Sequence, residues 1–151
     1  MEHHIHLRSA KEGDDRPLAD LYLASRQDAL GFLPKVHTDD EVRAWMSYVV
    51  LTKLDVQIAE IDGRIAGFIA LERGEIEQLY IHPDFYRRGA GRALMTWAMD
   101  RTRSDLSLHC FAANHRARRF YESFGFRPVK FGDGSGNEEG APDIRYVLYR
   151  S

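Results

Sequence analysis

The sequence lacks most of the features that mark secreted, membrane or nucleic-acid-binding chains. One cysteine, Cys110, excludes an internal disulfide framework and suits a reducing compartment. No apolar run approaches the about 20 residues that a membrane span needs, and residues 1–15 lack the apolar core of a secretory signal. A net charge of −2 provides no general attraction to nucleic acid or to an anionic membrane. We therefore expect a cytoplasmic protein with neither kind of partner.

What is present is the composition of an ordinary globular protein. Hydrophobic residues make up 44% of the sequence and charged residues 29%, and 151 residues suffice for one domain, 1–151, with a sizeable core. His3, His4 and His6 lie near the start without carboxylates or cysteines at ligand spacing. We therefore expect no metal site.

Apolar periodicity predicts the order of helices and strands. The order is β-α-α-β-β-β-α-β-α-β-β, which indicates an α/β or α+β fold with a mixed sheet. Thr38 and Glu41 have the spacing of a capping box at the start of the second helix. A polar loop, 132–143, is predicted to be the most mobile segment. The strands are expected over 4–8, 56–60, 65–71, 76–82, 106–112, 127–131 and 144–149, and the helices over 14–30, 38–53, 90–103 and 114–124.

The most informative segment is 75–92, EIEQLYIHPDFYRRGAGR, which leads from a strand through a basic turn into a helix. Free amides at a helix start bind anions, and Gly89 and Gly91 allow an anion to come close. A dinucleotide-binding fingerprint would require a small residue where the chain has Leu94, and the Gly-Lys-Ser/Thr of a phosphate-binding NTPase loop is absent. The segment predicts a phosphate cradle of another kind.

A second block, 114–126, reads NHRARRFYESFGF. Together the two blocks resemble the signature of the GNAT superfamily, the Gcn5-related N-acetyltransferases that use acetyl-coenzyme A. The resemblance covers nearly the whole chain and implies a mixed, mostly antiparallel central sheet flanked by helices. The family pattern Gln/Arg-x-x-Gly-x-Gly/Ala is matched at Gly89 and Gly91, whereas its first position holds Tyr86.

The resemblance implies which residues bind the coenzyme. The amides and basic side chains of the cradle would hold its pyrophosphate, Asn114 would bind the pantetheine arm besides capping a helix, and strand main chain would contact the acetyl group. The implied coenzyme-binding residues are Leu79, Tyr80, Ile81, Arg87, Arg88, Gly89, Ala90, Gly91, Arg92 and Asn114.

The resemblance also implies catalytic residues. Tyr121 would protonate the departing thiolate, since a phenol with a pKa near 10 keeps its proton at neutral pH. Glu75 and Glu77 are the candidate bases for the acceptor amine, and a bulge in their strand would decide which one faces the cleft. His109 is a further candidate base, and Cys110 is interpreted as a small buried residue.

The leading hypothesis is an acetyl-coenzyme A-dependent N-acetyltransferase in which an amine attacks the thioester directly. The alternative is a non-catalytic module that binds or senses acyl-coenzyme A on the same fold. The identity of the amine and the oligomeric state, including a homodimer, stay open. The acidic run in the loop 132–143 (Glu138, Glu139 and Asp143) is interpreted as solvated, although beside an acceptor cleft it would favour a cationic amine.

Overall fold

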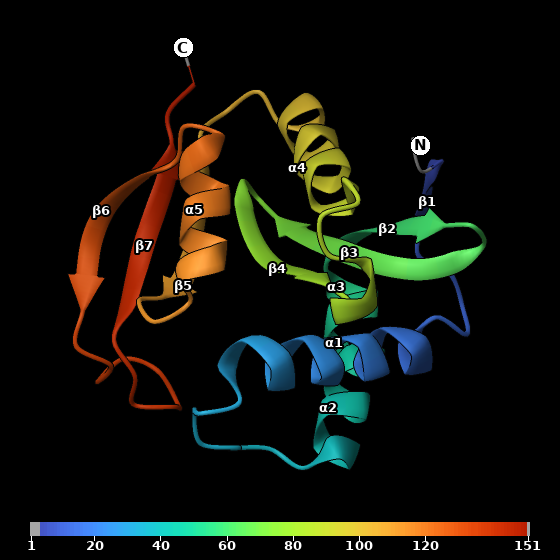
Figure 1. The fold of residues 1–151 in the computed structure, drawn as a ribbon, viewed down its shortest axis with the longest axis horizontal. Helices are drawn as coiled ribbons and strands as arrows, with labels where there is room; N and C mark the ends of the chain where they lie inside the picture. Colours follow the sequence, from blue (N-terminus) through green and yellow to red (C-terminus); the bar gives the residue numbers. More distant parts are fainter. Residues whose placement is uncertain (1–3, 151) are drawn as a thin grey trace.

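The computed structural model describes residues 4–150, whose helices and strands follow the predicted order (Figure 1). Most boundaries agree with the predicted ones to within one or two residues. The elements are β1 (Ile5–Ser9), α1 (Asp15–Leu30), α2 (Asp39–Trp45), η1 (Met46–Val50), α3 (Leu51–Lys53), β2 (Asp55–Ile61), β3 (Arg64–Glu72), β4 (Glu75–Ile81), η2 (Pro83–Phe85), α4 (Ala90–Arg101), β5 (Leu106–Phe111), α5 (His115–Ser123), β6 (Arg127–Gly132) and β7 (Asp143–Leu148).

The strands form one sheet in the order β1-β2-β3-β4-β5-β7-β6. Five of the neighbouring pairs are antiparallel, and β4 and β5 run parallel. This arrangement confirms the mixed, mostly antiparallel sheet. The parallel pair divides the sheet into an N-terminal part with β1–β4 and a C-terminal part with β5, β7 and β6.

Helices cover both faces of the sheet, so the molecule has three layers (Figure 1). On one face Leu94 and Met95 of α4 belong to the larger core cluster, together with Ile69 of β3 and Tyr121 of α5. On the other face α1, α2 and η1 pack on alternate residues of β2 and β3, such as Phe68. Successive side chains of a strand point to opposite faces, which is why neighbouring residues enter different clusters.

The second predicted helix forms as one helical run over 39–53. Its capping box is confirmed: the Thr38 hydroxyl accepts from the Glu41 amide at 3.1 Å, and the Glu41 carboxylate accepts from the Thr38 amide at 2.9 Å. The middle of the run, η1, is a π-helical turn. Apolar periodicity does not predict this turn, since a single widened turn changes the spacing of the buried positions little.

Candidate active site

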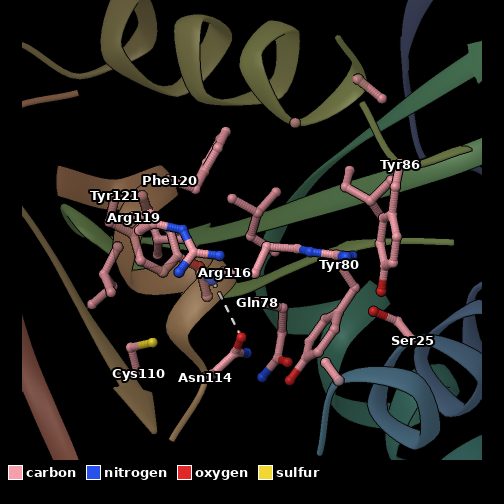
Figure 2. A pocket seen from close by; sticks show the side chains of 18 of the residues that line it. Ser25, Gln78, Tyr80, Tyr86, Cys110, Asn114, Arg116, Arg119, Phe120 and Tyr121 are labelled. Carbon is pink, nitrogen blue, oxygen red and sulfur yellow. Dashed lines mark hydrogen bonds between the residues drawn. The ribbon is translucent and has the colours of Figure 1, made fainter. Parts of the chain in front are cut away.

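A cavity of about 630 Å³ lies where β4 and β5 diverge. Within residues 4–150 the two strands pair at a single position, Glu75 opposite Ser107. Beyond that pair, one edge of β4 faces the cavity instead of a neighbouring strand, so its main-chain groups are available to a ligand. The walls come from α1, β4, β5, α5 and the segment between β4 and α4 (Figure 2).

The segment before α4 has the geometry of an anion cradle. Gly89 adopts a left-handed conformation, with φ of 90° and ψ of 0°, and no side chain in the described part of the chain caps the helix start. The first amides of the helix therefore keep their donors for an external anion. A Cβ at Gly91 would lie 3.4 Å from the Phe120 ring, which is an ordinary contact distance, so α5 packs close to the start of α4 here.

The predicted arginines take different positions around the cradle. Arg87 and Arg92 line the cavity together with Phe85, Tyr86, Gly89, Ala90 and Gly91 of the same segment. The Arg92 guanidinium also stacks 4.8 Å from the Phe124 ring centroid. Arg88 is outside the lining, and its guanidinium lies over the ring of Phe85 at 5.4 Å.

Asn114 connects the cavity to α5. Its Oδ1 accepts from the Ala117 amide at 3.2 Å, as the dashed line in Figure 2 marks, which confirms the predicted cap. Its side-chain nitrogen has no hydrogen-bond partner within residues 4–150, and the residue lines the cavity. The amide N–H donors of Asn114 are therefore available to a ligand.

Tyr121 lies on the buried face of α5 and also lines the cavity (Figure 2). Its ring packs between Phe120, Phe126 and Tyr146, with centroid distances of 5.6, 5.9 and 6.2 Å. Burial raises the pKa of the Tyr121 hydroxyl above its ordinary value, and the nearby Cys110 thiol acts in the same direction. The hydroxyl accordingly remains a proton donor throughout the neutral pH range.

A β-bulge in β4 separates the two glutamates that were predicted as bases. Ile76 and Gln78 of β4 oppose consecutive residues of β3, so Glu77 between them is the extra residue. A bulge breaks the alternation that would place Glu75 and Glu77 on one face of the strand. Glu77 lines the cavity, and Glu75 is outside its lining.

The surroundings of the two carboxylates also differ. Desolvation raises the pKa of Glu77, and the charge of Glu75 acts in the same direction. Glu75 lies 3.4 Å from Nδ1 of His109 and 3.8 Å from a guanidinium nitrogen of Arg145. His109 lines the cavity beside Glu77. The geometry thus favours Glu77 over Glu75 as the group that reaches a ligand, while the role of either residue stays a prediction.

The opposite wall comes from α1, and the sequence patterns do not single out its Ser25 and Arg26 as site residues. Ser25 and Arg26 of α1 line the cavity, and Arg26 donates to the Glu139 carboxylate at 2.8 Å. Both side chains of this ion pair are largely buried, at 17% and 14% exposure. His37 lies 2.6 Å from Glu138, but this pair is exposed, with 64% of the Glu138 side chain accessible. The interpretation of the acidic run as merely solvated is therefore wrong for Glu139, which is largely buried against Arg26, and holds for Glu138.

Two kinds of feature are not found in the described part of the chain. Across residues 4–150, no three His, Cys, Asp or Glu side chains gather in a way that would hold a metal ion. His3 of the N-terminal histidine tract lies outside these residues. No helix within the same range is both long and apolar enough to cross a bilayer.

Solved structures share this fold. YjaB from Escherichia coli superposes with a TM-score of 0.81 at 20% identity, covering 98% of this chain and 99% of its own. YncA from Salmonella typhimurium, solved with its cofactor acetyl-CoA, has a TM-score of 0.75 at 19% identity and covers 97% of this chain and 94% of its own. At these identities the likeness establishes the fold.

Sequence comparison establishes the family. An uncharacterized N-acetyltransferase of Archaeoglobus fulgidus is 38% identical over 98 residues, which are 55% of this chain and 66% of that protein. The sequence model of the Acetyltransferase (GNAT) family matches residues 9–126. The match includes the cradle, Asn114 and Tyr121, the residues that line the cavity between β4 and β5. This chain therefore belongs to the GNAT family of acetyltransferases.

Proposed function

We propose that the protein transfers the acetyl group of acetyl-coenzyme A to an amine by direct attack in a ternary complex. The observation that carries this proposal is that one cavity collects the free amides of the cradle, Asn114, Glu77 and the buried hydroxyl of Tyr121. Anion binding, amide hydrogen bonding and two proton-transfer groups are the functions that acyl transfer from coenzyme A to an amine requires.

The coenzyme would bind along the cleft between β4 and α5. Its pyrophosphate would meet the amides at Gly89–Gly91 and the guanidinium groups of Arg87 and Arg92, which together supply positive charge. Asn114 would donate to the pantetheine arm. The open edge of β4 at Leu79–Ile81 would then face the acetyl group, where a free amide stabilises negative charge on the carbonyl oxygen.

Glu77 and Tyr121 would handle the two protons. Glu77 would accept the proton that the attacking amine must lose, directly or through water. The amine nitrogen forms a bond to the carbonyl carbon, the carbon–sulfur bond breaks, and Tyr121 donates its proton to the thiolate sulfur. A raised pKa suits both groups: it makes the glutamate a better base and keeps the tyrosine protonated.

Cys110 supports direct transfer over an acetylated enzyme. Its thiol lines the cavity, yet burial raises its pKa to about 12. The thiolate is the nucleophilic form of cysteine, and at neutral pH it would be a very small fraction of this side chain.

Thermal unfolding with acetyl-coenzyme A, beside NADH and ATP as controls, tests the binding step. A ligand at 100 times its dissociation constant adds about 2.7 kcal/mol, which is a rise in Tm of about 5–10 °C for a chain of this length. Acetylation of a panel of small amines, peptide N-termini and lysine peptides tests the chemistry. A selective rise in Tm without turnover of any amine would favour the non-catalytic module instead, and no rise at millimolar coenzyme would contradict both.

A further inference from the structure

The one position where the cradle departs from the family pattern holds a stacked pair of side chains. Tyr86 stands where the pattern has Gln or Arg, and the Arg116 guanidinium lies over its ring, 4.1 Å from the centroid. Arg116 belongs to the first turn of α5, and its side chain reaches toward Tyr86 on the far side of the cavity (Figure 2). Both residues line the cavity. Tyr86 precedes Gly89 and Gly91 by three and five positions, and Arg116 follows Asn114 by two.

The other side of Tyr86 is held by α1. Its hydroxyl interacts with Ser25 and Asp28, and burial is the main cause that raises its pKa. Figure 2 shows the hydroxyl groups of Tyr86 and Ser25 pointing toward each other. The hydroxyl of Tyr86 therefore lies against α1, and one face of its ring is in contact with Arg116.

Arg116 differs from Arg118 on the same helix, α5. Arg118 donates to the Tyr146 hydroxyl at 3.1 Å and to the Ala112 carbonyl at 3.4 Å, so it is a structural residue. Within residues 4–150, no carboxylate lies within ion-pair distance of Arg116. Its contact is the aromatic face of Tyr86, and the residue is exposed to solvent beside the cradle.

Within residues 4–150 the N–H donors of the Arg116 guanidinium have no hydrogen-bond acceptor, and the contact with the Tyr86 ring requires none. Those donors match the spacing of phosphate oxygens and bind them in pairs. An arginine held over an aromatic ring in this way is still able to bind an anion.

We propose that Arg116 binds the pyrophosphate of the coenzyme, and that Tyr86 is the positioning residue that holds its guanidinium at the cradle. The pair replaces the basic or amide side chain that the family pattern has at the position of Tyr86. The inference rests on the proposed coenzyme site and assigns to it a cation from α5, across the cleft from the glycines.

Dissociation constants for CoA and for dephospho-CoA, which lacks the 3′-phosphate, test the assignment. We expect Arg116→Ala to weaken binding of both ligands by at least about tenfold, because a charge-assisted contact to phosphate is lost. Arg103→Ala is the matched control, since Arg103 is exposed and outside the cavity. Equal affinity of Arg116→Ala and wild type for CoA would overturn the proposal. A loss for CoA with none for dephospho-CoA would also overturn it, by assigning Arg116 to the 3′-phosphate.

The positioning role of Tyr86 has its own test. Tyr86→Phe keeps the ring and should stay within about twofold of wild type, whereas Tyr86→Ala should lose affinity severalfold. In an Arg116→Ala background, Tyr86→Ala should cause no further loss, and Tyr86→Arg should restore affinity by returning a cation to the motif position. Equal losses from Tyr86→Ala in both backgrounds, or no rescue by Tyr86→Arg, would overturn the role of Tyr86. Wild-type protein that binds neither CoA nor dephospho-CoA would instead contradict the proposed function itself.

Discussion

The two ends of the cavity are built in different ways. The proposed coenzyme end consists of two short segments, 86–92 and 114–121, each at the junction of a strand or turn with a helix. The proposed acceptor end consists of α1 and β4, and the Arg26–Glu139 ion pair ties α1 to the loop 132–143, joining residues 113 positions apart. Local backbone geometry shapes the glycine cradle of the first end, and a long-range ion pair supports the second. Substitutions at the two ends should therefore change different measured quantities.

The largest effect is expected at Tyr121, which lies between the two ends. Tyr121→Phe removes the proton donor while keeping the ring and its packing, so kcat should fall by about 100-fold or more. The Kd of acetyl-coenzyme A should stay the same, as measured by calorimetry. Tyr149→Phe is the matched control, because Tyr149 is 64% exposed and outside the cavity lining. An unchanged kcat across the pH range would refute the role of Tyr121 as the acid.

At the coenzyme end, Gly89→Ala should weaken acetyl-coenzyme A binding by about tenfold. Gly89 has a φ of 90°, and a side chain in the left-handed region costs about 1–2 kcal/mol. Gly91→Ala is the comparison, because Gly91 has no positive φ and its added Cβ would meet Phe120 at an ordinary contact distance of 3.4 Å. The Kd of both variants is to be measured together with their Tm. A larger loss of affinity for acetyl-coenzyme A in Gly91→Ala than in Gly89→Ala would mean that the space at the cradle, and not the backbone conformation of Gly89, determines how well the coenzyme binds.

At the acceptor end, Glu139→Gln should lower the free energy of unfolding by about 1 kcal/mol, since it leaves the largely buried Arg26 without its charged partner. The Kd of acetyl-coenzyme A should not change, whereas the KM of an amine acceptor should. Chemical denaturation measures the free energy of unfolding. Glu138→Gln is the control: its carboxylate is 64% exposed, so its loss should have less effect on stability. A shift in coenzyme affinity as large as that of Gly89→Ala would show that the two ends are not independent.

The smallest expected effect is a change in pKa. The negative charge of Glu75 disfavours the charged form of Glu77 and so raises its pKa. Glu75→Gln removes that charge, and the pKa of Glu77 should fall toward its ordinary value without reaching it, because desolvation is the larger cause. Carboxyl carbon-13 NMR titration measures this shift. A pKa for Glu77 that rises in Glu75→Gln would mean that the two carboxylates are not coupled as their positions imply.

Local signals in the sequence predict the local geometry of the proposed coenzyme end, whereas its binding roles stay predictions. A capping residue, a glycine pair at a helix start and an apolar stripe each act within one or two helical turns, so Asn114, Gly89 and Tyr121 are found where their patterns indicate. The same patterns do not predict that Arg92 lines the cavity while Arg88 does not. In the structure Arg88 lies over the ring of Phe85 and Arg92 over the ring of Phe124, contacts that the local sequence does not specify.

The acceptor end carries weaker signals. Ser25 is a polar residue on an otherwise apolar helix face. It is only 5% exposed and lines the cavity, so a buried polar residue in an apolar stripe was the signal for this wall. The two glutamates of β4 illustrate another limit. Alternation would place them together, but a bulge is a feature of strand pairing, and pairing involves a partner strand that the local sequence does not specify.

The sequence by itself determined the order of helices and strands, the cradle and its glycines, the cap at Asn114 and the aromatic face of α5, because each depends on contacts between near neighbours. Only the tertiary structure decided that β4 and β5 diverge into a cavity, that Glu77 and not Glu75 lines it, and that Arg116 stacks on Tyr86 across it. These features arise where segments distant in the chain meet. At such places the local sequence allows several side-chain positions, and the packing of the distant segments against each other selects one of them.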